Sequence, residues 1–147
     1  MTVTRVVLMK QYFYLRSHFF AFEENFMVTQ QSHLGINYVN SVAVVTFLDK
    51  NIRWEGKGDL VNAVSTELIA IANDEQNILL DFQGVTYFDE SMIGKLVTFW
   101  QKMRKKCKIV MCNVEGFLLE SMLVKRLDLL FGFQAGRTQE QALRLFD

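Results

Sequence analysis

The chain has 147 residues, half of them apolar, and its 16 basic and 16 acidic side chains balance to a formal net charge of zero. This length fits one domain with a real hydrophobic core, and the composition excludes an intrinsically disordered chain. Because neutralisation of phosphates supplies much of the affinity for DNA and RNA, the absence of a basic excess argues against a nucleic-acid-binding protein.

The first 26 residues are rich in aromatic side chains but have no steady helical or alternating pattern. Their apolar stretches are interrupted by Arg16, His18 and Glu23. They therefore fall short of the ~20 apolar residues of a membrane span, and no small-residue cleavage site suggests a signal peptide. Three interpretations remain open: an amphipathic extension, a partner-binding tail, or a stretch upstream of a true start at Met27, which we favour. We expect a cytoplasmic protein without membrane insertion.

The domain is expected to occupy residues 34–147, after an N-terminal extension of residues 1–33. Its first two strands are predicted at 35–39, where apolar and polar residues alternate, and at 42–48, a nearly continuous β-branched run typical of a central strand. The turn-forming pair Asn40-Ser41 joins them. These elements predict a β-hairpin.

Strands and helices alternate along the rest of the domain. Three more strands are expected, the last at a sheet edge: residues 78–82, 109–112 and 129–133. Four segments have helical spacing of apolar residues: 59–72, 90–103, 114–123 and 138–146. Helix N-caps are predicted at Asp59, Asp89 and Thr138. The order β-β-α-β-α-β-α-β-α predicts a single α/β domain with a mixed, mostly parallel sheet of about five strands. Five strand residues should be buried: Val44, Leu79, Leu80, Val110 and Met111.

Catalytic and metal-binding patterns are scarce. Both histidines, His18 and His33, precede the first predicted strand and are poorly placed to act as the general base for a catalytic nucleophile. Cys107 and Cys112 fit reduced thiols in or near the core, and no zinc spacing surrounds them. Gly56-Lys57-Gly58 reads as a turn because it lacks the context of a phosphate loop. We therefore expect no cofactor, no metal and no enzyme; a degenerate small enzyme is the weakest alternative.

A cluster of cations ends the helix predicted at 90–103: Lys102, Arg104, Lys105, Lys106 and Lys108. It could form a patch for nucleic acid or anionic lipid. With no basic excess elsewhere, we interpret it as complementing the negative end of the helix dipole.

The stretch from Gly84 to Gly94 joins a buried strand to a helix N-terminus, where unpaired N–H groups favour anions. On physical grounds alone, a helix capped by Asp89 explains it. The longer stretch from Ile78 to Leu96 nevertheless resembles the signature of the STAS family, the anti-sigma factor antagonists and related domains of sulfate transporters. That signature is a strand ending Asp-Phe, a loop with spaced apolar residues, and Asp-Ser-Ser-Gly-Leu-Gly.

The C-terminal part extends the resemblance. Leu127 to Phe131 and Thr138 to Leu143 are similar to the family's closing strand and helix, so the resemblance covers about Leu34 to Phe146. It implies a non-catalytic protein that binds an anti-sigma factor, itself a serine kinase, and so frees a sigma factor. Phosphorylation of the first Ser of Asp-Ser-Ser-Gly stops this binding in the family. Phosphate adds roughly −1.5 to −2 charges to the contact surface.

The resemblance places the binding face on the helix that begins near Glu90 and on the loop from Asn51 to Glu55. The partner-binding residues it implies are Asn51, Arg53, Trp54, Asp89, Glu90, Ser91, Met92 and Lys95. Trp54 is either a partial lid on the core or an exposed aromatic anchor of the kind enriched at interfaces.

The sequence departs from the family at the switch. Glu90 stands where the phosphorylated Ser is expected, Met92 stands where Gly is expected, and Ser91 matches the second Ser. Glutamate cannot be phosphorylated and already carries a negative charge. The switch is therefore fixed, moved to Ser91, or absent. An alternative to the antagonist role is a STAS subunit of a larger complex such as a lipid-transport system, and a homodimer is compatible with the sequence.

Overall fold

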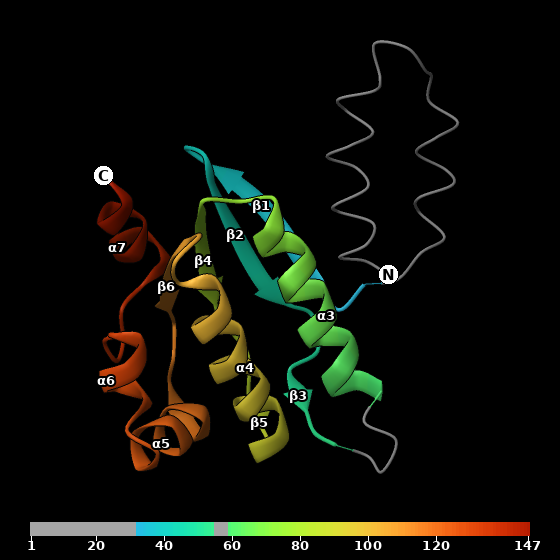
Figure 1. The fold of residues 1–147 in the computed structure, drawn as a ribbon. Coiled ribbons are helices and arrows are strands. Elements are labelled where there is room, and N and C mark those ends of the chain that lie inside the picture. Colours follow the sequence, from blue (N-terminus) through green and yellow to red (C-terminus); the bar gives the residue numbers. More distant parts are fainter. Residues whose placement is uncertain (1–31, 55–58) are drawn as a thin grey trace.

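The computed structural model describes residues 32–54 and 59–147, and the remaining residues are drawn in grey in Figure 1. The aromatic N-terminal segment and the Gly56-Lys57-Gly58 turn lie outside the described residues. The described chain forms a central sheet with helices on both faces, in agreement with the α/β class expected from the sequence.

The main sheet has four strands in the order β1-β2-β4-β6: β1 (Leu34–Val39), β2 (Val42–Phe47), β4 (Asn77–Asp81) and β6 (Lys108–Cys112). β1 and β2 pair antiparallel as the predicted hairpin, and β2, β4 and β6 run parallel. Asn40 and Ser41, at the hairpin turn, both have positive φ angles. The sheet is therefore mixed and mostly parallel.

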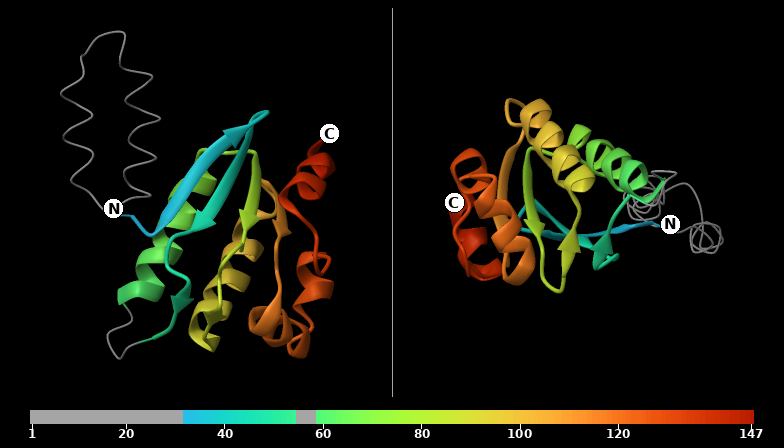
Figure 2. Two further views of the ribbon diagram at one scale, coloured as in Figure 1. Left: turned by 180° about the vertical axis from the view of Figure 1, so that it is seen from behind. Right: turned by 90° about the horizontal axis from the view of Figure 1, so that it is seen from below.

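Helices α3 (Asp59–Asn73) and α4 (Glu90–Met103) cover one face of this sheet (Figure 1). The short α7 (Gln139–Leu143) and the 3-10 helix η1 (Arg144–Phe146) lie near the opposite face, seen from behind in Figure 2. Thr138 caps α7, as predicted, and also forms a complete capping box with Gln141.

The five strand residues expected in the core are all buried. Their side chains alternate between two apolar clusters, as the pleat requires. Leu80 and Met111 face the cluster built with α3 and α4. Val44, Leu79 and Val110 lie side by side across the sheet and face the second cluster, which contains Ala142 of α7.

The prediction of an edge strand at residues 129–133 is wrong. Leu127–Phe131 forms a short helix, α6, after α5 (Gly116–Val124). Left-handed residues bound α6 on both sides, Arg126 with φ 58° and Gly132 with φ 67°, so the chain turns where a strand would continue. Leu127 and Phe131, four residues apart, are buried on one helical face.

Two short strands were expected only as loops. β3 (Asn51–Ile52) and β5 (Tyr87–Phe88) form a separate two-stranded parallel sheet. Two-residue strands have too little periodicity to be recognised in a sequence. This small sheet connects the segment that follows β2 with the segment that leads into α4.

Candidate protein-binding surface

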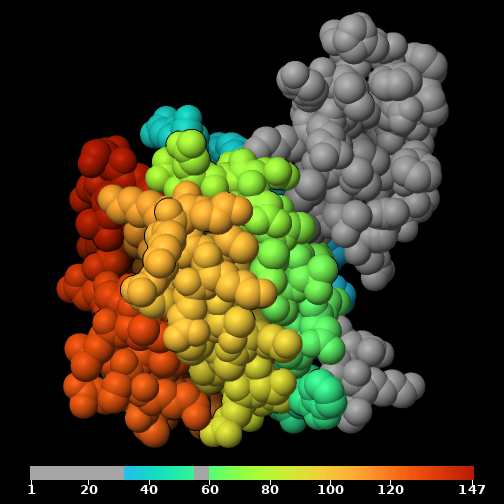
Figure 3. Space-filling view, in the orientation of Figure 1, coloured from blue at the N-terminus to red at the C-terminus, as the bar shows by residue number. Residues whose placement is uncertain are grey.

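The predicted binding residues gather at the carboxyl edge of the parallel strands, where ligand sites of open α/β sheets commonly form. In β3–β5, Asn51 lies opposite Tyr87 and Ile52 opposite Phe88. The Ile52 carbonyl also accepts a hydrogen bond of 3.0 Å from the Asp89 N–H. Figure 3 shows the residues just after 50, the start of α4 and residues of α5 side by side along the lower edge.

Asp89 fixes the start of α4 to the β3 loop. Its Oδ1 accepts a hydrogen bond of 2.9 Å from the Met92 N–H, which confirms the predicted N-cap. Its Oδ2 accepts a hydrogen bond from the Trp54 N–H. One carboxylate thus caps the helix and holds the neighbouring loop, so the two halves of the expected surface share a common anchor.

The predicted residues differ in exposure. Asn51, Arg53, Trp54, Glu90 and Lys95 are exposed, whereas Asp89 and Ser91 are half-buried. Met92 is the exception, because its side chain is fully buried in the main core. The Met92 side chain packs beneath the start of α4 and is not accessible to a partner.

Glu90 carries an ion pair that the sequence does not reveal. Its side chain is 86% exposed, and its Oε1 lies 2.9 Å from the Nζ of Lys125, which follows α5. Such exposed pairs add little to stability. The pair instead places an ammonium group beside the carboxylate, so the negative charge of Glu90 is partly compensated within the chain.

Aromatic and cationic groups continue the surface from β3 to α5. The Arg53 guanidinium lies 5.0 Å from the centroid of the Tyr87 ring, and Arg53 Nε donates to Asn51 Oδ1 over 3.0 Å. The Tyr87 ring lies 5.6 Å from that of Phe117. Trp54 is 50% exposed. Of the two interpretations of this residue, a partial lid on the core and an exposed aromatic anchor, this exposure favours the second.

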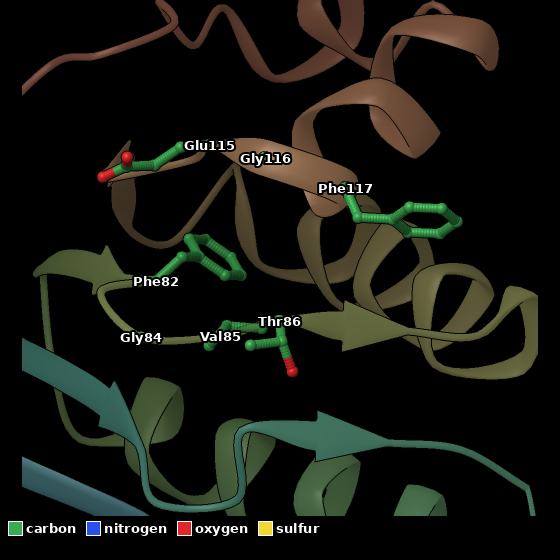
Figure 4. A pocket seen from close by; sticks show the side chains of 7 residues that line it. All are labelled: Phe82, Gly84, Val85, Thr86, Glu115, Gly116 and Phe117. Carbon is green, nitrogen blue, oxygen red and sulfur yellow. The ribbon is translucent and has the colours of Figure 1, made fainter.

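Two grooves flank Phe117. The loop groove, about 430 Å³, is lined by Phe82, Gly84, Val85, Thr86, Glu115, Gly116 and Phe117. In Figure 4 the Phe82 ring points toward the start of α5, and Glu115 and Phe117 project in opposite directions along the rim. The helix groove, about 340 Å³, is lined by Tyr87, Phe88, Glu90, Ile93, Phe117, Glu120, Ser121, Val124 and Lys125. Sequence reasoning missed both. The loop groove depends on how the start of α5 packs against the segment between β4 and β5, and the helix groove depends on how α5 packs beside α4.

Features of catalysis are weak in the described residues. Between 32 and 54 and from 59 on, no group of three or more His, Cys, Asp or Glu residues could hold a metal ion. The His33 ring is paired with Asp49 (Nδ1 to Oδ2, 2.7 Å). Burial raises the pKa of the Cys107 thiol, and burial with the neighbouring Asp81 carboxylate raises that of Cys112 to about 12. Both thiols are therefore poor nucleophiles at neutral pH.

Comparison with known proteins agrees with this architecture. The family model of the STAS domain matches residues 36–142, most of the described chain. The chain belongs to the STAS domain family. No curated protein matches it in sequence. None of the helices in the described part of this STAS domain has the length and hydropathy of a membrane span.

Solved structures show the same fold at low sequence identity. An anti-sigma-factor antagonist (STAS) domain protein from Planctomyces limnophilus is 20% identical, with a TM-score of 0.66 over 80% of this chain and 100% of that one. An anti-sigma factor antagonist from Mycobacterium paratuberculosis is 15% identical, with a TM-score of 0.62 over 76% and 91%. The murine anion transporter Slc26a9 is 13% identical, with a TM-score of 0.59 over 74% of this chain but only 18% of the transporter.

Proposed function

We propose that this STAS domain is a regulatory protein-binding module of the anti-sigma factor antagonist type, acting in the cytoplasm and without catalysis. Its partner is an anti-sigma factor that is also a serine kinase. The observation that carries the proposal is the start of α4, where an exposed Glu90 stands on a helix held from both sides. Asp89 joins it to the β3 loop, and Lys125 joins it to the end of α5.

This arrangement suits recognition by a protein. Exposed aromatic and cationic groups, Trp54 and Arg53, adjoin the helix start, and such side chains are enriched at the energetic centres of interfaces. The fixed backbone limits the entropy lost on binding. Two structural neighbours are described as anti-sigma factor antagonists, which supports the same partner class.

The regulation proposed here differs from the phosphorylation switch of the family. Glu90 occupies the acceptor position and cannot take a phosphate, and Lys125 offsets its charge. A carboxylate carries about half the charge of a phosphoserine. The domain therefore stays competent for binding when a kinase and ATP are present.

A binding titration tests the proposal. The full chain is titrated into purified kinase-type anti-sigma factors encoded in the same genome, alone and in complex with their sigma factors. We expect saturable binding to one of them and release of its sigma factor. Binding to none, together with co-purification with transporter subunits, would instead support the role of a STAS subunit in a transport complex.

A further inference from the structure

Helix α5 exposes an unusual share of its apolar side chains. Only Leu118 and Met122 of this nine-residue helix are buried, whereas Phe117 is 58% and Val124 is 83% exposed. Isolated exposed apolar residues are common on protein surfaces. These two residues are not isolated, because both line the helix groove and Phe117 also lines the loop groove.

Phe117 forms a ridge between the two grooves. On one side Phe82 and Val85, both buried, line the loop groove. On the other side Ile93 and the half-buried Tyr87 line the helix groove. A chain segment with two apolar side chains could place one in each groove and enclose the exposed Phe117 ring between them.

The charges around the Phe117 ridge indicate which kind of chain segment binds there. The two linings together contain three carboxylates, Glu90, Glu115 and Glu120, and one ammonium, Lys125. Lys125 is already paired with Glu90. The other two carboxylates have no ion-pair or side-chain hydrogen-bond partner in the part of the chain that the structure describes.

We propose that the Phe117 ridge and its two grooves dock a segment of a partner protein that presents two apolar side chains next to lysine or arginine. The site extends the proposed binding surface from α4 onto α5, and only the identity of the partner rests on the proposed function. Two cations besides Lys125 lie close to the grooves but outside both linings. The Arg53 guanidinium lies over the Tyr87 ring, and Lys50 Nζ donates a hydrogen bond to the Gln83 carbonyl, next to Gly84. The uncompensated carboxylates repel anionic membranes and nucleic acids, and they attract a basic segment.

A synthetic peptide of alternating leucine and lysine pairs tests the site without any knowledge of the partner. It is titrated into the isotope-labelled full chain while backbone amide shifts are followed by NMR. We expect saturable shifts confined to α5, β5 and the start of α4, and weaker binding at high salt. Shifts spread over the whole surface, or equally tight binding of a leucine–glutamate peptide or of phosphatidylglycerol vesicles, would overturn the proposal.

Matched variants sharpen this test. Phe117→Ala and Glu120→Lys should each weaken peptide binding by about tenfold, the loss expected for an interface hot spot. Leu145→Ala and Glu140→Lys, exposed residues of η1 and α7, should leave it unchanged. If Phe117→Ala lowers the melting temperature, Val124→Ser, at the more exposed position, replaces it. Unchanged binding by the ridge variants would refute the site.

The outcomes separate the two proposals. Peptide binding at the ridge without binding of any anti-sigma factor would contradict the proposed function and leave the docking site standing. Binding of an anti-sigma factor that Glu90→Lys abolishes and the ridge variants do not affect, with no peptide binding, would refute the docking site alone.

Discussion

The Asp89 carboxylate accepts a hydrogen bond from the backbone N–H of Trp54, 35 residues earlier in the chain, while its other oxygen caps α4. Asp89, the N-cap of α4, thus also sets the position of the β3 loop. This relationship explains how two segments far apart in sequence come to lie side by side at one surface.

Removal of this carboxylate should cost more than an ordinary helix cap. Asp89→Ala loses the cap and the bond to Trp54, so we expect the free energy of unfolding to fall by about 1–3 kcal/mol. Thr138→Ala, which removes only the cap of α7, should cost about 1 kcal/mol. Urea unfolding measures both changes. An equal or smaller loss for Asp89→Ala would show that the hydrogen bond from Trp54 to Asp89 contributes nothing to the free energy of unfolding.

The central strand should not tolerate a charge. Leu80 is fully buried between β2 and β6, and Leu80→Asp places an unpaired carboxylate in the main core. The cost of several kcal/mol is comparable with the about 5–15 kcal/mol stability of a typical domain, so we expect an unfolded protein. Leu129→Asp is the control, because Leu129 is 69% exposed on α6. Circular dichroism should show native helix content for that variant only.

A chain that starts at Met27 should unfold at the same temperature as the full chain. Residues 1–26 lack the periodicity of a core element. The retained residues include the hydrogen bonds at the start of the described chain, from the His33 N–H to the buried Glu67 carboxylate and from the Leu48 N–H to the His33 carbonyl. A melting temperature lower by more than a few degrees, measured by calorimetry, would show that the aromatic segment stabilises the domain.

The sequence predicted the residues governed by local patterns. Asp89 and Thr138 were recognisable as caps because capping depends on the next three residues. The pairing of Glu90 with Lys125 was not, since it depends on how α5 packs beside the start of α4. The segment at 129–133 was misassigned as a strand because a short apolar-rich run fits either a strand or one helical turn. The burial of Leu127 and Phe131 on one face of α6 decides for the helix.

Glu90→Ser should restore the family's phosphorylation site. Position 90 lies at the exposed start of α4, open to a kinase. Ser91 projects roughly 100° around the helix from it and is half-buried, so it is a poor substitute. After incubation with ATP and the kinase that binds the domain, intact mass spectrometry should find phosphate on Glu90→Ser and none on the parent. Phosphate on Ser91 of the parent would show that the switch has moved.

The most direct test of the account compares two charge reversals in the anti-sigma factor titration. Glu90 and Glu140 are similarly exposed, at 86% and 81%, and each pairs with a cation at 2.9 Å, but Glu140 lies on α7, away from the start of α4. We predict that Glu90→Lys weakens binding by about tenfold or more, as expected at the centre of an interface, and that Glu140→Lys leaves the dissociation constant unchanged. Equal effects of the two reversals, or none from Glu90→Lys, would contradict recognition through the start of α4.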